Sequence, residues 1–375
     1  MLIRIAFTGG GTGGHIFPHI AVSRSLLKIA EKEGINLRFY YIGPAIFNAS
    51  IFENEGINVR WIRAGKFRRY MSFLNIIDLF KIGLGFIESL WYLWRIMPDV
   101  IFSKGGYGAL PVALAAWVYR IPILIHESDA IPGMVNKISS RWAKKIAISF
   151  DRTKNFFPLT KTNLIGLPIR TQLLDQNKNE AKKNLGLDLD RKVVLVTGGS
   201  QGSSRINDFI LDILPDLTRS YELIQVSGVK DYERVLQEGK IMISDELRRF
   251  WHLVDFLDES SLADAYAAAD IIISRSGASS IFEIASVGLP SILIPLPESA
   301  QDHQKENAYE YARVSGATVL EETNLKSGII LTQIEKILND PALSRSLQEK
   351  SKNFSNLGAA DAIAAELLDL AKANS

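Results

Sequence analysis

The chain has 375 residues, a formal net charge of +2 and no cysteine. This length exceeds one ordinary hydrophobic core and suits two domains of about 150–200 residues each. The absence of cysteine excludes disulfides, thiolate metal sites and a cysteine nucleophile, and the nearly balanced charge argues against a dedicated nucleic-acid binder.

Short β-branched runs alternate with helical patterns along the chain, which predicts an α/β fold of parallel sheets covered by helices on both faces. The strands expected in the first half are 3–8, 37–42, 59–62, 100–103, 123–126, 145–148 and 162–164. Those expected in the second half are 193–197, 222–226, 253–256, 271–274, 291–294 and 318–320. No apolar stretch is long enough to span a membrane, and no secretory signal is expected, so we expect a protein that stays in the cytoplasm.

The strand series restarts at Lys192, where a strand again enters a glycine-rich turn. We therefore expect two Rossmann-like, doubly wound domains facing a central cleft, where sheets of this kind bind ligands. The expected N-terminal domain is 1–165 and the expected C-terminal domain is 166–355. A helix at about 356–375 is expected to pack back on the N-terminal domain.

A glycine-rich loop, TGGGTGGH, follows the first strand and ends at His15. The spacing of Gly9, Gly11 and Gly14 matches the dinucleotide fingerprint, but the next strand lacks the terminal carboxylate that would hold a ribose. NAD or FAD is therefore not expected. Clustered glycines at a helix start still let the backbone approach an anionic or polyhydroxylated ligand.

A second glycine loop runs from Gly198 to Gly202, again between a strand and a helix. It lacks the Gly-Lys-Ser/Thr ending of a nucleoside-triphosphate loop, so hydrolysis of ATP or GTP is not expected. Ser200 and Gln201 suit hydrogen bonding to a diphosphate or a sugar. We expect no metal ion, because Asp188-Leu-Asp190 lies in a variable polar stretch and no such pair stands at a loop.

Polar groups also follow two later strands. The strand ending at Ser274 continues through Arg-Ser-Gly into a helix that carries Glu283, among apolar neighbours. A carboxylate can accept two hydrogen bonds from the vicinal diol of a ribose; the alternative for Glu283 is a solvated helix carboxylate. The segment 297–308 supplies amides and carboxylates that suit sugar hydroxyls.

Together these segments resemble the MurG family of bacterial N-acetylglucosaminyltransferases, in the GT-B superfamily. The matching segments keep the family order over nearly the whole chain: 8–23, 103–116, 126–137, 166–170, 198–207, 275–297 and 302–308. The resemblance implies inverting transfer of N-acetylglucosamine from UDP-N-acetylglucosamine to the muramyl 4-hydroxyl of undecaprenyl-pyrophosphoryl-muramoyl-pentapeptide. This hexosyl transfer converts lipid I to lipid II in peptidoglycan synthesis and is implied to need no cofactor.

The resemblance also implies roles for individual residues. The base that activates the acceptor hydroxyl stays open among His15, Glu127 and Asp129. Further substrate-binding positions are Thr12, Gly13, Gly14, His126 and Asn136 in the N-terminal domain, and Arg170, Ser200, Gln201, Phe256, Leu257, Ser276, Gly277, Glu283, Gln304 and Asn307 in the C-terminal domain. Arg170 is implied at the phosphates, Glu283 at the ribose, and Gln304 with Asn307 at the sugar. Phe256 and Leu257 precede the helix implied to border the uracil.

Two positions depart from the family pattern. Ser128-Asp129 stands where many members carry Gln-Asn, and Leu167 replaces a frequent asparagine. Asp129 would supply basicity that an amide lacks.

The segment 63–95 mixes basic residues with many aromatic and aliphatic ones. Its charged residues exclude a spanning helix, but a basic, aromatic-rich amphipathic segment suits the headgroup region of an anionic bilayer. The alternative is a helix packed on its own sheet. We expect peripheral attachment to the cytoplasmic face of the membrane through about 63–95.

Three other functions remain open from the sequence: a GT-B transferase acting on another lipid, a UDP-N-acetylglucosamine 2-epimerase, and a nucleotide-sugar-binding module without catalysis. Transfer to a muramyl-pentapeptide polyprenyl-pyrophosphate acceptor distinguishes the first expectation from all three.

Overall fold

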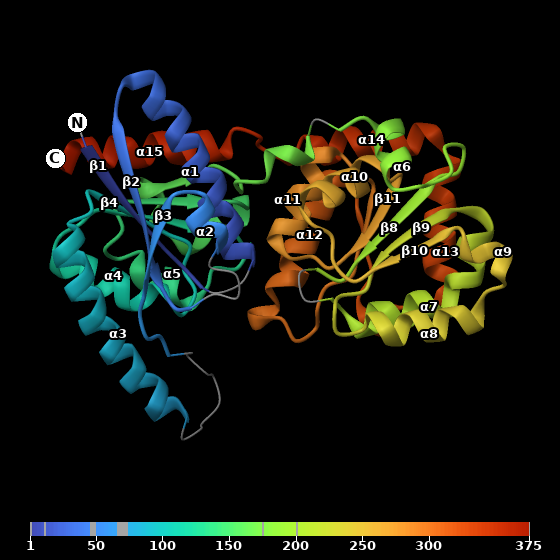
Figure 1. Cartoon of the computed structure of the whole chain (residues 1–375), viewed down its shortest axis with the longest axis horizontal. Coiled ribbons are helices and arrows are strands. Elements are labelled where there is room, and N and C mark those ends of the chain that lie inside the picture. The colour runs from blue at the N-terminus through green and yellow to red at the C-terminus, as the bar shows by residue number, and fades with distance from the viewer. Residues whose placement is uncertain are drawn as a thin grey trace. The chain divides into compact units, whose positions relative to one another are not determined.

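The computed structural model describes residues 2–10, 13–45, 50–65, 74–174, 176–199 and 202–374, with the backbone alone for Gly13, His15, 74–77 and Thr171. The chain forms two compact units (Figure 1). The first unit comprises Met1–Ile169 together with Asn356–Ser375, and the second unit comprises Arg170–Ser355.

The described part of the first unit contains a seven-stranded parallel sheet in the order β3-β2-β1-β4-β5-β6-β7. Because the chain first adds strands on one side of β1 and then on the other, the loops after β1 and β4 meet where the strand order reverses. The strands are β1 (Leu2–Thr8), β2 (Asn36–Gly43), β3 (Ile57–Trp61), β4 (Val100–Ser103), β5 (Ile123–Glu127), β6 (Lys145–Ile148) and β7 (Thr162–Leu164). The helices are α1 (Gly13–Glu33), α2 (Ser50–Asn54), α3 (Leu74–Ile96), α4 (Ala109–Val118), α5 (Met134–Ser139) and α15 (Ala359–Asn374).

The second unit repeats this plan with a six-stranded parallel sheet in the order β10-β9-β8-β11-β12-β13, counted over its described residues. The strands are β8 (Val193–Thr197), β9 (Glu222–Val226), β10 (Trp251–Val254), β11 (Ile271–Ser274), β12 (Ser291–Leu293) and β13 (Thr318–Val319). The helices are α6 (Lys178–Asn184), α7 (Ser204–Ser220), α8 (Tyr232–Met242), α9 (Asp245–Arg248), α10 (Glu259–Ala268), α11 (Ala278–Val287), α12 (His303–Ser315), α13 (Ser327–Asn339) and α14 (Pro341–Lys352). These two parallel-sheet domains confirm the expected fold class.

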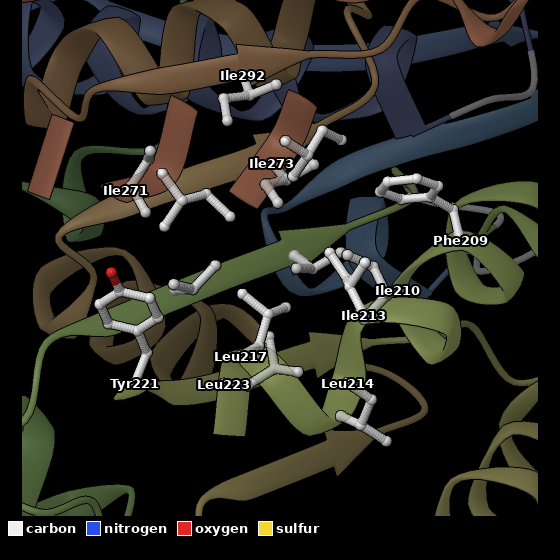
Figure 2. Packing of buried hydrophobic residues seen from close by; sticks show 14 of the residues in the cluster. Phe209, Ile210, Ile213, Leu214, Leu217, Tyr221, Leu223, Ile271, Ile273 and Ile292 are labelled. Carbon is white, nitrogen blue, oxygen red and sulfur yellow. The ribbon is translucent and has the colours of Figure 1, made fainter. Parts of the chain in front are cut away.

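Helix α7 explains how the second sheet is covered. Its side chains Ile206, Phe209, Ile210, Ile213, Leu214 and Leu217 are buried and recur at helical spacing. Figure 2 shows several of them facing Ile271 and Ile273, which lie two residues apart on β11 and therefore on one face of the sheet. Each fully buried aliphatic side chain of this kind contributes roughly 1.5–3 kcal/mol.

Helix α15 completes the first unit although it comes from the end of the sequence. It packs on α1 and β4 and buries Ile363, Leu367 and Leu368 in the same cluster as the β1 side chains. Figure 1 shows it, in red, beside the blue helix α1.

Most expected strands coincide with observed strands, but the expected strand at 253–256 has the wrong bounds. β10 spans Trp251–Val254, because its pairing with β9 begins at Trp251, whose indole N–H donates to Gln225 at 3.0 Å. The carboxylate of Asp255 then accepts the Phe256 amide at 2.7 Å, which turns the chain out of the sheet. The first unit extends to Ile169, because the Ile165 and Gly166 amides both bond to the Ile148 carbonyl of β6.

Candidate active site

The carboxyl edge of the first sheet carries a buried polar cluster. Ser103 pairs with Ile125, so the residues that follow β4 lie beside the end of β5. Lys104 follows β4 and is 2% exposed. His126 and Glu127 end β5 and are 0% and 4% exposed. Buried polar groups of this kind must find partners in the protein, because an unpaired one costs several kcal/mol.

Lys104 and His126 form a chain of hydrogen bonds across this edge. The Lys104 Nζ atom lies 2.5 Å from Nδ1 of His126 and donates to Ser128 Oγ at 2.5 Å. Nε2 of His126 lies 2.8 Å from the Gly166 carbonyl oxygen. A neutral imidazole satisfies both contacts, accepting at Nδ1 and donating from Nε2. His126 is thus fixed inside the protein.

Glu127 holds the loop that follows β5. Its Oε1 accepts the Asp129 amide at 3.1 Å, and its Oε2 accepts the Gly133 amide at 3.0 Å and Asn136 Nδ2 at 2.9 Å. Both oxygens therefore serve the conformation of the loop. Asn136, on α5, is buried, and its amide group completes this arrangement.

Gly105 is required beside Asn136. Its φ is +73°, and a Cβ atom there would lie 2.5 Å from Oδ1 of Asn136. Any side chain would therefore displace the amide that binds Glu127. Asp129, in contrast, is half-buried, and its carbonyl accepts the hydroxyl of Thr153 at 3.0 Å.

The protonation states in this cluster follow from burial. Burial lowers the pKa of Lys104 to about 7, although the charges of Glu127 and Asp129 oppose the change. Burial and the nearby Lys104 ammonium hold the pKa of His126 well below its ordinary value. Burial and the charge of Asp129 raise the pKa of Glu127, while its three hydrogen bonds act in the opposite direction.

The first glycine loop lies at the neighbouring edge of β1. The carbonyl oxygen of Gly9 accepts the Tyr41 hydroxyl at 3.3 Å, and a Cβ on Gly9 would meet Lys104 Cβ at 3.3 Å. Gly13 and Gly14 open α1. Thr12 and the side chain of His15 lie outside the described residues.

In the second unit, the predicted residues Arg170 and Glu283 bind each other. Nε and Nη2 of Arg170 donate to Oε1 of Glu283 at 3.1 and 2.6 Å, and the Tyr266 hydroxyl donates to Oε2 at 3.3 Å. Burial opposes the charge of Arg170, but the Glu283 carboxylate raises its pKa. Burial and the neighbouring carboxylate raise the pKa of Tyr266 well above its ordinary value. The Glu283 carboxylate therefore keeps the Arg170 guanidinium charged despite its burial.

Arg275 ties three loops of the second sheet together. Its Nη1 donates to the carbonyl oxygens of Ile294 and Pro295 at 3.2 Å each, and its Nη2 donates to Ser203 Oγ at 2.7 Å. The same Nη2 lies 2.5 Å from Oε1 of Glu322. These contacts join the segments after β8, β12 and β13 to Arg275, which follows β11.

The start of α12 is joined to the β11 loop. Ser276 Oγ donates to the Gln304 carbonyl at 2.7 Å, and Asn307 Nδ2 donates to the Ser276 carbonyl at 3.4 Å. The Gln304 side chain accepts the Leu296 amide at 3.1 Å. Ser276, Gln304 and Asn307 therefore lie together, and Gly277 is the N-cap of α11 beside them.

The remaining predicted residues of the second unit are placed differently. Ser200 and Gln201 lie outside the described residues, between Gly199 and Gly202, which have φ values of +81° and +73°. Phe256 is 64% exposed. Leu257 is half-buried, and both precede α10, as expected.

Helix α3 presents large apolar side chains to solvent. Leu79, Phe80, Ile87, Trp91 and Trp94 are exposed, and the two tryptophan rings lie 5.4 Å apart. Figure 1 shows the amino-terminal half of α3 extending beyond the sheet of its unit. Among the described helices, none combines the length and apolarity needed to cross a bilayer.

Three residues of the site were not predicted. Lys104 carries a recognisable signal, a charged residue directly after a buried strand within the 103–116 segment. Arg275 stands in the same position after β11. Tyr266 carries no sequence signal, because an aromatic residue in the middle of a helix reads as core. No cluster of acidic and histidine side chains suited to a metal ion occurs in the part of the chain that the structure describes.

Comparisons with known proteins agree with this arrangement. The N-terminal domain of glycosyltransferase family 28 matches residues 5–148, and the C-terminal domain of that family matches residues 193–365. A relative from Legionella pneumophila (strain Paris) is 36% identical over 337 residues, 89% of this chain and 88% of its own. A relative from Bacillus subtilis (strain 168) is 34% identical over 368 residues, 96% of this chain and 97% of its own. Both are named UDP-N-acetylglucosamine–N-acetylmuramyl-(pentapeptide) pyrophosphoryl-undecaprenol N-acetylglucosamine transferase.

Solved structures share the fold. MurG from Acinetobacter baumannii superposes with a TM-score of 0.72 at 23% identity, over 98% of this chain and 99% of that one. A UDP-GlcNAc 2-epimerase from Neisseria meningitidis, bound to UDP-GlcNAc, superposes with a TM-score of 0.68 at 14% identity, over 98% and 99%. Both likenesses identify the GT-B fold.

Proposed function

This chain belongs to glycosyltransferase family 28, among its MurG transferases, and we propose that it transfers N-acetylglucosamine from UDP-N-acetylglucosamine to the muramyl 4-hydroxyl of undecaprenyl-pyrophosphoryl-muramoyl-pentapeptide. The reaction converts lipid I to lipid II in peptidoglycan synthesis and inverts the anomeric centre of the donor. The observation that carries this conclusion is identity of 36% and 34% to transferases of that name over nearly their whole length. The 2-epimerase shares only the fold, at 14% identity, so no residue-level observation favours it.

The donor, in this proposal, binds to the second unit. Glu283 accepts the ribose hydroxyls, Arg170 binds the phosphates, and Gln304 with Asn307 reads the sugar. The support is that Gln304 and Asn307 contact Ser276, which lies just after the carboxyl end of β11, where sheets of this topology bind nucleotides. Glu283, which binds Arg170, lies on the helix that follows this loop. Ser276 and Gly277 contribute a helix start, which favours negative charge. Ser200 and Gln201 belong to the same proposed set.

The acceptor, in this proposal, binds to the first unit near the glycine loop and the loop after β5. The base removes the proton of the 4-hydroxyl as that oxygen bonds to the anomeric carbon, and the carbon–oxygen bond to UDP breaks with its electron pair going to the diphosphate. Glu127 is less suited to the role of base, because it is 4% exposed and accepts three hydrogen bonds within its own loop. We propose Asp129, which is half-buried on that loop, as the base. His15 is the alternative, and mutation of each residue distinguishes the two.

In this proposal, the protein contacts the membrane through α3. The enzyme attaches peripherally to the cytoplasmic face, with the exposed aromatic and aliphatic side chains of α3 in the headgroup region. The basic residues Arg63 and Lys81 flank this surface, while Lys66, Arg68 and Arg69 lie outside the described residues. A polyprenyl-linked acceptor requires such a position at the bilayer.

The deciding experiment measures transfer of labelled N-acetylglucosamine onto a muramyl-pentapeptide polyprenyl-pyrophosphate analogue, with EDTA present. A β-1,4-linked product supports the proposal and shows that the reaction needs no divalent metal. A protein that binds UDP-N-acetylglucosamine but forms no product, with or without added divalent metal, contradicts the acceptor assignment. Conversion of the donor to UDP-N-acetylmannosamine without acceptor would instead identify an epimerase.

A further inference from the structure

Lys104 is the buried cation of the first unit's polar cluster. It is not among the residues predicted from the sequence, and the proposed reaction gives it no role. It follows β4, its side chain is 2% exposed, and its backbone amide bonds to the Thr8 carbonyl at the end of β1 at 2.9 Å. The residue therefore stands where the glycine loop and the loop after β5 meet. A lysine is rarely buried to this extent unless its ammonium group is paired.

The Nζ atom of Lys104 contacts two residues of the segment that carries the carboxylates. It lies 2.5 Å from His126 Nδ1 and 2.5 Å from Ser128 Oγ. His126 continues the chain to the Gly166 carbonyl at 2.8 Å. Ser128 lies directly before Asp129, so Nζ anchors the residue that precedes the proposed base.

The charged groups around Lys104 act on one another. Glu127 and Asp129 both attract its ammonium group, and Asp129 also acts on the Glu127 carboxyl. The other titratable groups facing this position are His126 and, on the far side of Gly9, His19 of α1 and Tyr41 of β2. Two carboxylates and one buried cation in such surroundings hold protons jointly, and removing the cation favours their protonated forms.

We propose that Lys104 is a positioning residue for the acceptor-side chemistry: its amino group fixes Ser128 and His126 and balances the charge of the Glu127–Asp129 segment. This inference rests on the proposed transferase function. Below about pH 7, where carboxylates take up protons, the Lys104 amino group carries its charge, because its pKa is about 7. Removing Lys104 is therefore expected to move the acidic limit of activity to a higher pH.

The test compares Lys104→Met with Lys104→Gln in the transferase assay. Met removes both the hydrogen bonds and the charge, whereas Gln keeps a donor and removes only the charge. We expect both variants to lose at least tenfold in kcat at pH 7 and to move the acidic limb of the kcat–pH profile upward by about one unit. The KM for UDP-N-acetylglucosamine should stay within twofold. Lys32→Met, which removes an exposed lysine from the last turn of α1, is the matched control.

The proposal would be overturned if the acidic limb of the kcat–pH profile of Lys104→Gln matched that of the wild-type enzyme. Lys104 would then act through hydrogen bonds alone. The thermal midpoint and UDP-N-acetylglucosamine affinity of each variant show whether it is folded. If neither variant folds, the ¹³C-lysine NMR titration of the otherwise native enzyme decides. Asp129→Asn should lower the titration midpoint of Lys104, and an unchanged midpoint would refute the coupling. Absence of transfer by the wild-type enzyme would instead refute the proposed function and leave this titration result standing.

Discussion

Arg170 donates two hydrogen bonds to one oxygen of Glu283, from Nε at 3.1 Å and from Nη2 at 2.6 Å. A carboxylate oxygen offers two acceptor directions, so Oε1 is fully occupied, whereas Oε2 has one direction left beside the Tyr266 hydroxyl. A ribose diol on Glu283 therefore requires Arg170 to release Oε1. If the released guanidinium turns to the phosphates, donor binding exchanges one ion pair for another.

Replacing Glu283 with Gln should weaken UDP-N-acetylglucosamine binding by roughly ten- to a hundredfold, because a hydrogen bond to a charged group contributes about 1.5–3 kcal/mol. Isothermal titration calorimetry with the donor measures this. Glu349→Gln, an exposed carboxylate on α14, is the control and should bind as the wild type does. Equal affinities in the two variants would remove Glu283 from the donor site.

Replacing Arg275 with Met should destabilise the second unit by at least about 2 kcal/mol, because two buried carbonyls would each lose a donor at about 1–3 kcal/mol. Glu322 would keep its ion pair with Arg205. Denaturant unfolding measures the loss. Arg313→Met removes an arginine whose side chain is 68% exposed, and should cost at most about 1 kcal/mol. A loss no larger than that of the control would show that Arg275 does not hold the loops together.

Replacing Asp129 with Asn should lower kcat by about 10²–10⁴-fold with little change in donor affinity, because a general base would be lost while the donor site stays intact. Steady-state kinetics with both substrates varied separates these effects. Asp151→Asn is the control, since its carboxylate pairs with Lys154 at the surface. If Asp129→Asn keeps its kcat and His15→Ala does not, the base is His15.

The stability of the wild-type protein should rise with pH above neutrality relative to Lys104→Met. The pKa of Lys104 is lowered to about 7 in the folded protein, whereas an unfolded lysine titrates near 10.4. Between these values the unfolded chain holds a proton that the folded chain lacks, so the free energy of unfolding increases with pH by at most about 1.4 kcal/mol per unit. Below about pH 7 both states are protonated, and this pH dependence disappears. Denaturant unfolding curves of the wild type and Lys104→Met at pH 7.5 and pH 9 test this prediction. Equal changes in the free energy of unfolding of the two proteins between these pH values would contradict it.

Replacing Trp91 and Trp94 with Ser should reduce binding to phosphatidylglycerol-containing vesicles by at least roughly tenfold, because each buried tryptophan contributes on the order of 1.5–3 kcal/mol. Vesicle co-sedimentation at low salt measures this. Ile241→Ser changes an apolar residue of the second unit that is 87% exposed, and should bind as the wild type does. Equal binding by all three proteins would place the membrane contact elsewhere.

The two-sheet fold was predictable because parallel strands buried on both faces are continuous β-branched runs. The strands β4, β6, β8 and β11 coincide with their predicted bounds for this reason. β10 did not, since Leu253–Phe256 is as apolar as the true strand and its start is set by the pairing of Trp251 with Leu223 of β9, supported by the bond between the Trp251 indole and Gln225. Sequence periodicity cannot report a bond between side chains 26 residues apart.

The site was predictable only as far as its residues lie beside recognisable turns. Glu283 and Asn136 were expected to bind substrate, and the structure adds that they are bound by Arg170 and Glu127 respectively. Those pairings depend on the packing of segments that are separate in the sequence, and so does the burial of Lys104. They appear only once the sheet order is known.

The return of α15 to the first unit has a consequence for the order of folding during synthesis. The faces of α1 and β4 that receive Ile363, Leu367 and Leu368 stay uncovered until residues 356–374 leave the ribosome, after the whole second unit has been translated. The second unit is continuous in sequence and can close first, so the domain begun earlier on the ribosome is finished later. During that interval the first unit exposes an apolar strip to chaperones and to neighbouring chains. The first unit can be completed only after α15 has been translated to its end.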